Sequence, residues 1–304
     1  TLTVDILVSD ASGHPVLHVQ GWEEAGSRAG QTLRDFVMNP AHYFITQPLP
    51  DSILPKCNAR GAAKQIVGAL YVNANPEFFV NNAGLWLDAL AAAVLTPTER
   101  EDFVRMGGAP LRRLEWLLGR TAAKEAVRRL LLDNFRVLEP SADIAVWKDE
   151  LGKPHPLGDW LQQIASPIDL SIAHTGGLII GGATTVGHLG FDVESTSRDL
   201  TEDFLRGAFT LEEQELATRS GDGPIAILRF WCAKEAISKA LGTGIRFAAT
   251  DLRVRAADPA TGQLGLELLG AWAENFPNLR GKRIPIKTSV LYDHVIACCH
   301  LLER

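Results

Sequence analysis

The 304-residue chain lacks several features that would place it in a special class of protein. No apolar run approaches the roughly 18 residues of a membrane-spanning helix, and the first residues form no signal-peptide pattern. Basic residues are not in excess, and the net charge of −6 argues against a bulk attraction to nucleic acid. The four cysteines, at positions 57, 232, 298 and 299, show no metal-ligand spacing. We therefore expect reduced thiols, a cytoplasmic setting, and neither a membrane nor a nucleic-acid partner.

The composition itself is that of a globular protein large enough to bury one large core or two small ones. Residues 1–8 and 15–21 predict a β-hairpin around the turn at Asp10–Gly13. A lone hairpin is marginal in water and the chain does not begin with Met, so we expect a piece of a longer polypeptide. Residues 21–75, with prolines at positions 40, 48, 50 and 55, are interpreted as an irregular connecting segment.

An internal repeat organises the rest of the chain. The capping boxes Thr96–Glu99 and Thr210–Glu213 are each followed by a tryptophan and then by Ala-Lys-Glu-Ala, at 123–126 and 233–236. Ala-Lys-Glu is common in helices, but two copies behind two capping boxes favour a duplication. Short strands are expected at 170–173, 178–184, 251–256, 264–268, 286–292 and 295–302. We predict an α+β fold with two similar α/β lobes, about 74–184 and 185–304, related by a pseudo-twofold axis, with a ligand cleft between them and a short β-rich segment before them.

Two acidic motifs indicate the chemistry. Asp192 and Glu194 lie two apart on a predicted strand and therefore share a face. Trp231, Glu235 and Lys239 share one side of a predicted helix. Carboxylates hold Mg²⁺ together with substrate phosphates, and lysines attract phosphate, so chemistry on a phosphate ester or anhydride is expected. The alternatives are two solvated acids at a strand end and a surface Glu-Lys pair.

Other polar residues fit the same chemistry and also have plainer interpretations. His174 ends a strand before a glycine turn, where it can reach a phosphate oxygen or serve as a hydrogen-bonded loop histidine. Gly152-Lys153-Pro154 predicts a loop. A basic stripe on the first long helix can bind an anion or form a solvated face; its members are Arg112, Arg113, Arg120 and Lys124.

These motifs, in this order, resemble the 4′-phosphopantetheinyl transferases of the surfactin-type, pseudo-dimeric branch. The resemblance runs from about residue 75 to 304 and includes 152–154, 171–175, 190–194 and the pattern Trp231-x-x-Lys-Glu-Ala-x-x-Lys239. It implies an enzyme that transfers the phosphopantetheine arm of coenzyme A, its co-substrate, to a serine of an acyl carrier protein. The implied by-product is 3′,5′-ADP, and the implied metal is Mg²⁺.

The resemblance also implies residue roles. Asp192, Glu194 and Glu235 would ligate Mg²⁺, with Glu235, directly or through a water, as a candidate base for the carrier serine. Asp192 and Lys239 complete the implied catalytic set, Lys239 by meeting the pyrophosphate. The implied coenzyme A contacts are Arg113, Arg120, Lys124, Lys153, Pro154, His174, Thr175 and Lys234.

Within that coenzyme A set, Lys153 and Pro154 would frame the adenine and His174 would hold a phosphate. Lysines of the family that follow the helix-opening Ser/Thr-Pro are missing here, so the 3′-phosphate would depend on Arg113 and Arg120.

The first part of the chain resembles the closing part of a hot-dog dehydratase-type domain of a large polyketide synthase. The helix 111–132 resembles transferases fused to such synthases, including the enediyne type. We therefore expect a dehydratase tail at 1–73, a transferase at 74–304, and a carrier domain of the same antibiotic-producing synthase as partner. The alternatives are a non-catalytic domain that binds coenzyme A or a carrier, or braces the synthase, and an unrelated Mg²⁺-dependent phosphohydrolase.

Overall fold

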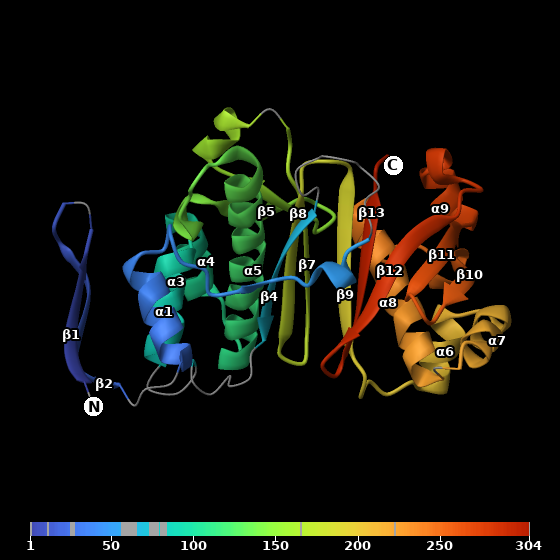
Figure 1. Cartoon of the computed structure of the whole chain (residues 1–304), viewed down its shortest axis with the longest axis horizontal. Coiled ribbons are helices and arrows are strands. Elements are labelled where there is room, and N and C mark those ends of the chain that lie inside the picture. Colours follow the sequence, from blue (N-terminus) through green and yellow to red (C-terminus); the bar gives the residue numbers. More distant parts are fainter. Residues whose placement is uncertain are drawn as a thin grey trace.

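Two antiparallel sheets, each packed against one long helix, form the body of the molecule (Figure 1). The computed structural model describes residues 2–10, 12–24, 28–55, 66–72, 79, 84–164, 166–221 and 223–303. The first sheet has the strand order β3 (Gln47–Pro48), β4 (Ile66–Val72), β8 (Leu178–Thr184), β7 (Asp169–Thr175). The second has the order β10 (Leu252–Asp258), β11 (Gln263–Leu268), β12 (Ile284–Leu291), β13 (His294–Leu301), β9 (His188–Ser195). The mixed α/β class and the strands expected from the sequence are thereby confirmed.

The two long helices are α5 (Pro110–Phe135) and α8 (Pro224–Leu241). Each has proline in its first turn, where the missing N–H costs nothing. Helix α5 packs on β8 and β4, and α8 packs on β9 and β13. The other helices are α1 (Arg28–Met38), α3 (Leu85–Val94), α4 (Pro97–Arg105), α6 (Glu202–Ala208), α7 (Leu211–Arg219) and α9 (Gly270–Asn275). No helix in the described part of the chain is both long and apolar enough to cross a membrane.

The amino-terminal region is only partly as expected. Strands β1 (Leu2–Ser9) and β2 (Pro15–Glu24) pair antiparallel, so the predicted hairpin is confirmed, and it stands beside the helices at one end of the molecule (Figure 1). The prediction of a connecting segment at 21–75 is wrong. Helix α1 buries Leu33 and Phe36 among the apolar side chains of α3 and α5, and β4 pairs with β8 along its whole length. The prolines lie between these elements, Pro48 on an edge strand that tolerates a missing donor.

A buried ion pair joins the capping box of α4 to α5. The Thr96 side chain accepts a hydrogen bond from the Glu99 N–H, and the Glu99 carboxylate accepts one from the Thr96 N–H. The same carboxylate lies 2.5 Å from Nζ of Lys124, and its other oxygen accepts from the N–H of Val146 at 3.0 Å. Lys124 also donates to the carbonyl of Val94 at 2.7 Å. One acid thus caps a helix, pairs with a second helix and holds the first residues of β5 (Ala145–Lys148).

The same contacts recur in the second half of the chain. Thr210 and Glu213 form the capping box of α7. The Glu213 carboxylate lies 2.8 Å from Nζ of Lys234 and accepts from the N–H of Val254 at 2.9 Å. Lys234 donates to the carbonyl of Ala208 at 2.7 Å. The repeat seen in the sequence is therefore a repeat of buried contacts, because each capping acid has the same three kinds of partner in both halves.

The two sheets meet at their edge strands β7 and β9. Hydrogen bonds run from the N–H of Leu189 to Oδ2 of Asp169 at 2.7 Å and from the N–H of Phe191 to Oγ of Ser171 at 2.8 Å. Phe191 fills the apolar layer between the sheets and rests on Gly182 of β8, where a Cβ would come within 2.2 Å of its ring. The two edge strands therefore run side by side in the same direction, with a long helix on either side.

Candidate active site

A cavity of about 310 Å³ lies where these elements converge. Its walls come from α5, β7, the loop between β5 and β6 (Pro154–Leu157), and the carboxyl end of α8. Four cationic residues line it, namely Arg120, Lys148, Lys153 and Lys239. The cavity also contains His174 and one acid, Glu115. Three of these cations also pair with acids, Arg120 with Glu99, Lys153 with Asp169 and Lys239 with Asp192, but the lining as a whole is rich in cationic side chains and suits an anionic ligand.

Arg120 is the arginine of the basic stripe that lines this cavity. Its guanidinium stacks on the Trp116 ring at 3.4 Å from the centroid, and its Nε lies 3.5 Å from Oε1 of Glu99. Burial lowers the pKa of Arg120, and Glu99 opposes that shift; an arginine keeps its charge under these conditions. Arg113 does not line the cavity, because its guanidinium lies 4.4 Å from the Phe103 ring centroid instead. Of the two arginines expected at the 3′-phosphate, Arg120 lines the cavity and Arg113 does not.

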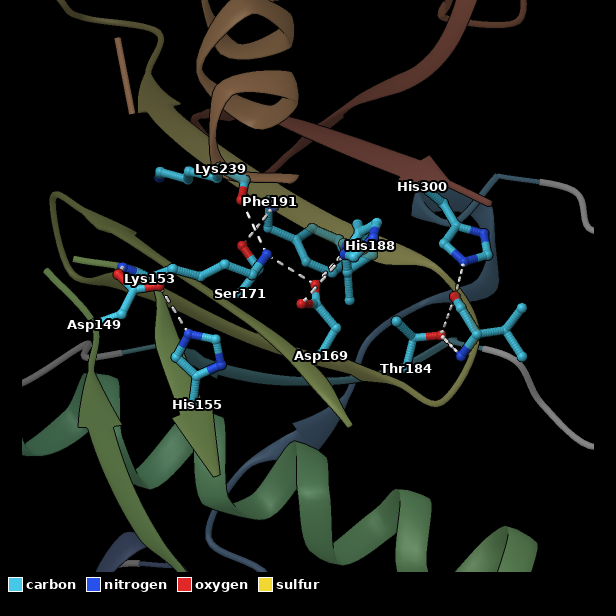
Figure 2. A network of polar contacts seen from close by, with 12 residues as sticks. Asp149, Lys153, His155, Asp169, Ser171, Thr184, His188, Phe191, Lys239 and His300 are labelled. Carbon is cyan, nitrogen blue, oxygen red and sulfur yellow. Dashed lines mark hydrogen bonds and ion pairs between the residues drawn. The ribbon is translucent and has the colours of Figure 1, made fainter. Parts of the chain in front are cut away.

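Lys153 lines the cavity and connects its walls through polar contacts, which Figure 2 shows. Its Nζ donates to Oδ2 of Asp169 at 2.9 Å and to the carbonyl of Lys239 at 3.2 Å. The residue is only 6% exposed, so its ammonium group is turned toward these partners. Gly152, with φ of 86°, makes the turn that brings Pro154 into the wall. Lys153 thus ties the loop to β7 and to the end of α8, and can frame a flat ligand with its stem and backbone.

The predicted pairing of the two acidic motifs is realised between β9 and α8. Nζ of Lys239 donates to Oδ1 of Asp192 at 2.7 Å, and Nε1 of Trp231 donates to Oε1 of Glu194 at 3.2 Å. Both carboxylates therefore leave the same face of β9, as expected from their spacing. Asp192 is 7% exposed, and within the described residues no hydrogen-bond partner reaches its buried Oδ2. That oxygen is an acceptor in need of a cation or a donor.

Glu235 stands on α8 one turn from both Trp231 and Lys239. Its pKa is raised first by burial and next by the negative charge of Asp192, while Lys239 and Arg198 act in the opposite direction. A carboxyl group whose pKa is raised by burial and by a neighbouring carboxylate is typical of a site that binds a cation or handles a proton.

Two of the three expected ligands, Asp192 and Glu235, have carboxylate oxygens that suit a hard divalent cation. Asp192 offers its unpartnered Oδ2, and Glu235 offers a carboxylate that feels the charge of Asp192. Glu194 already accepts an ion pair from Arg198 and a hydrogen bond from Trp231. Over the described ranges, no three His, Cys, Asp or Glu side chains gather into a ready-made metal cage. Mg²⁺ is commonly bound by one or two protein carboxylates, and substrate phosphates and waters fill its other coordination positions.

Lys124 and Lys234 lie outside this site, contrary to the expectation that both contact coenzyme A. Both side chains are fully buried and bound to Glu99 and Glu213. Burial lowers the pKa of Lys124 to about 8, and Glu99 counteracts it. The physical reason for the difference is that each lysine points from its helix toward the capping acid of the preceding helix, which takes up its charge.

The remaining expected residues line the cavities. His174 opens into the main cavity and also into a second one of about 240 Å³, whose wall includes Thr175. The protein around His174 lowers its pKa, mainly by burial, and Glu115 opposes this.

Sequence reasoning missed several cavity residues. Lys148 ends a strand without any motif, and Trp116 was noted only as part of the repeat. Gly242 and Gly244 also line the cavity just after α8, and a Gly-x-Gly directly after a helix was a signal that could have found them.

Comparisons with known proteins identify a family and several relatives. The family model described as the 4′-phosphopantetheinyl transferase superfamily matches residues 188–299. A holo-[acyl-carrier-protein] synthase of Cereibacter sphaeroides (strain ATCC 17029 / ATH 2.4.9) is 33% identical over 119 residues, 38% of this chain and 86% of the relative. A protein of the same description from Jannaschia sp. (strain CCS1) is 40% identical over 83 residues, 27% of this chain and 53% of the relative.

Among solved structures, the holo-[acyl-carrier-protein] synthase of Neisseria meningitidis is 22% identical with a TM-score of 0.32, covering 40% of this chain and 97% of its own. The Plasmodium yoelii acyl carrier protein synthase with ADP bound is 23% identical with a TM-score of 0.33, covering 40% of this chain and 94% of its own.

Proposed function

This chain belongs to the 4′-phosphopantetheinyl transferase superfamily, and we propose that it transfers the phosphopantetheine arm of coenzyme A to a serine hydroxyl of an acyl carrier protein. The observation that supports this most concerns Lys239, which lines the basic cavity and also donates a hydrogen bond to Asp192. The carboxyl group of Glu235 is close enough to both residues to feel their charges. Coenzyme A brings a pyrophosphate and a 3′-phosphate, which the cations of the cavity would bind. In this proposal, the acids act at the phosphorus–oxygen bond of that pyrophosphate that breaks.

The cavity residues bind and orient the nucleotide half of coenzyme A. Arg120, held flat against Trp116, would receive the 3′-phosphate without losing rotamer freedom on binding. Pro154 and the stem of Lys153 would frame the adenine. His174, at the end of β7 between the two cavities, would donate to a phosphate oxygen.

The reaction replaces one phosphorus–oxygen bond by another. The serine oxygen attacks the phosphorus that carries the pantetheine arm, its proton passes to Glu235 directly or through a water, and the anhydride bond to 3′,5′-ADP breaks. Lys239 would neutralise negative charge on the departing phosphate. Mg²⁺ held by Asp192 and Glu235, with Glu194 as a third candidate, would neutralise pyrophosphate charge. The raised pKa of Glu235 makes it a stronger base than an ordinary glutamate.

We also propose a pseudo-twofold arrangement of the two lobes, which is the surfactin-type organisation. In support, the family model spans only residues 188–299, all within the second half, while the first half repeats its buried Glu-Lys contact and its sheet-on-helix packing. We place residues 28–55 and 66–72 with the first lobe, because α1 and β4 share its core and its sheet. The hairpin at 2–24 remains the candidate for the tail of a preceding dehydratase-type domain.

The proposed biological setting is a polyketide synthase that carries its own activating transferase for antibiotic biosynthesis. The cytoplasm is the proposed compartment, supported by Cys232, Cys298 and Cys299, which are buried thiols. The partner would then be a carrier domain of the same synthase. An unmodified carrier in the presence of bound coenzyme A would favour the alternative of a binding or bracing domain.

Measuring 3′,5′-ADP release tests the proposed reaction. The chain would be incubated with Mg²⁺, coenzyme A and an apo carrier protein, beside a carrier whose acceptor serine is replaced by alanine. We expect release only with the intact carrier. Release with the serine-less carrier would instead identify a hydrolase.

A further inference from the structure

Asp169, the first residue of β7, lies where the two sheets meet, and the proposed reaction gives it no role. Its Oδ2 accepts a hydrogen bond from Nζ of Lys153 at 2.9 Å, which Figure 2 shows, and one from the N–H of Leu189 at 2.7 Å. Nδ1 of His188 lies 3.8 Å from its other oxygen, Oδ1. The Asp169 side chain is only 13% exposed, so protein groups rather than water surround it. A carboxylate with such fixed donors can hold another side chain in place.

Lys153 connects Asp169 to the carboxyl end of α8. The same ammonium group donates to the carbonyl of Lys239 at 3.2 Å, near the end of the helix, where carbonyls need partners from outside the regular helix. A cation is electrostatically favourable at this end of a helix. The side chain of Lys239 in turn donates to Asp192. One series of contacts therefore runs from Asp169 through Lys153 and Lys239 to the acidic site.

The backbone around Lys153 is fixed separately, by Asp149. Oδ1 of Asp149 accepts hydrogen bonds from the N–H groups of Leu151 and Lys153, both at 2.9 Å. Its Oδ2 lies 2.9 Å from Nε2 of His155. These contacts order the turn between β5 and β6, but they do not determine where the ammonium group of Lys153 points. Asp169 and the end of α8 determine that direction.

Pairing with Asp169 also determines what Lys153 presents to a ligand. The Lys153 side chain is 4% exposed, and the carboxylate of Asp169 balances its charge. The ammonium group is therefore directed into the protein, and the cavity wall offers the apolar stem of Lys153 beside Pro154. Such a wall suits an uncharged ring, whereas an exposed cation such as Lys148 suits a phosphate.

Resting on the proposed function, we propose that Asp169 is a positioning residue for coenzyme A binding. Its carboxylate holds Lys153 against the end of α8 and balances its charge, so that this wall of the cavity is in place before the ligand arrives. Asp169 does not line the cavity and acts through Lys153. Its removal therefore weakens binding and leaves the chemical step almost unchanged.

The test compares Asp169→Asn with Asp169→Glu. Asparagine has the same shape without the charge, so the KM for coenzyme A and the inhibition constant of 3′,5′-ADP should both rise about tenfold, as for the loss of one charge-assisted hydrogen bond. The kcat should stay within about twofold of the wild type, because Lys239 keeps its contact with Asp192. Glutamate keeps the charge and should recover most of the affinity. A role in packing alone predicts the opposite order, because asparagine fits the same space and glutamate does not.

The substitution Lys153→Met decides whether Asp169 acts through Lys153. Adding Asp169→Asn to Lys153→Met should raise the KM no further, because the effects of two residues in one interaction do not add. The matched control is Glu267→Gln, which removes the charge of a strand acid that pairs with Arg255 at 2.7 Å outside the main cavity. This control should keep the wild-type KM.

Three results would overturn the assignment: an unchanged KM in Asp169→Asn, a larger loss in Asp169→Glu than in Asp169→Asn, or a full additional effect in the Lys153→Met background. Calorimetric titration of the same variants with coenzyme A, which requires no turnover, should give the same order of affinities. A wild-type chain that binds coenzyme A but modifies no carrier would refute the proposed function and leave this comparison valid, so the two failures are distinguishable.

Discussion

At the scale of single residues, the site depends on one carboxylate with an incomplete set of partners. Asp192 is nearly buried; its Oδ1 accepts a hydrogen bond from Lys239, and its Oδ2 has no hydrogen bond within the described residues, with the Cys232 thiol beside the carboxylate. Burial of such an atom costs free energy, which a bound cation would offset. Asp192→Ala should therefore reduce transfer by at least about a hundredfold and weaken Mn²⁺ binding followed by electron paramagnetic resonance. Asp293→Ala, which changes an exposed acid, is the control; equal metal binding in both variants would exclude Asp192 as a ligand.

Arg120 and Arg113 make a matched pair for the 3′-phosphate. Arg120 lines the cavity, whereas Arg113 packs on Phe103 outside it. Arg120→Ala should raise the KM for coenzyme A by about tenfold or more and affect 3′-dephospho-coenzyme A much less, because one charge-assisted contact is lost. In Arg113→Ala, the ratio of the KM values for the two substrates should stay near that of the wild type. Initial rates with both substrates decide this, and a similar ratio in the two variants would contradict the assignment.

The protonation of Glu235 predicts the acid side of the pH profile. Its pKa is raised by burial and by Asp192. As the pH falls, the carboxylate of Glu235 therefore takes up its proton at a higher pH than an exposed glutamate does. At Mg²⁺ concentrations too low to load the free enzyme, kcat/KM should therefore decline with falling pH around a midpoint above the usual glutamate value. Glu235→Gln should lose transfer while still binding coenzyme A in a titration. Wild-type turnover in that variant would rule out Glu235 as the base.

At the scale of elements, the long helices are held by buried ion pairs to the capping acids. Removing one partner leaves an uncompensated buried charge, which typically costs about 3–5 kcal/mol. Lys124→Met and Lys234→Met should each lower the free energy of unfolding by about that amount, measured by urea titration. Lys148→Met is the converse control, because Lys148 is exposed at the cavity and should affect coenzyme A binding more than stability. A selective loss of coenzyme A affinity in Lys124→Met would restore its role as a ligand.

The elements show what sequence alone could predict. Capping boxes, strand alternation and the i, i+4 spacing on α8 are local signals, so the helices α4, α7 and α8 and most strands were predicted well. Helix α1 was missed because the prolines after it and its few apolar residues suggested a linker. The fate of Lys124 could not be predicted, because a stripe on a helix does not reveal which neighbour it faces. The contact of Asp192 with Lys239 likewise arises only from the packing of β9 on α8.

At the scale of the whole molecule, the two halves share a long helix packed on a sheet, but the glutamate at the matching place in each long helix has different surroundings. Glu235 of α8 is half-buried beside the acidic site. The glutamate at the matching place in α5, Glu125, is fully buried and accepts hydrogen bonds from Ile45 and Thr46. The first half thus uses this position to bind its own chain, in the stretch between α1 and β3.

The most direct measurement is the intact mass of an apo carrier protein after incubation with this chain, coenzyme A and Mg²⁺. Parallel samples would contain a chelator or the Asp192→Ala variant. A carrier heavier by one phosphopantetheine arm, seen only with the wild-type chain and metal, is the predicted result. The carriers tested would be ones that a known transferase modifies. If the wild-type chain leaves the mass of all of them unchanged, the central claim is contradicted.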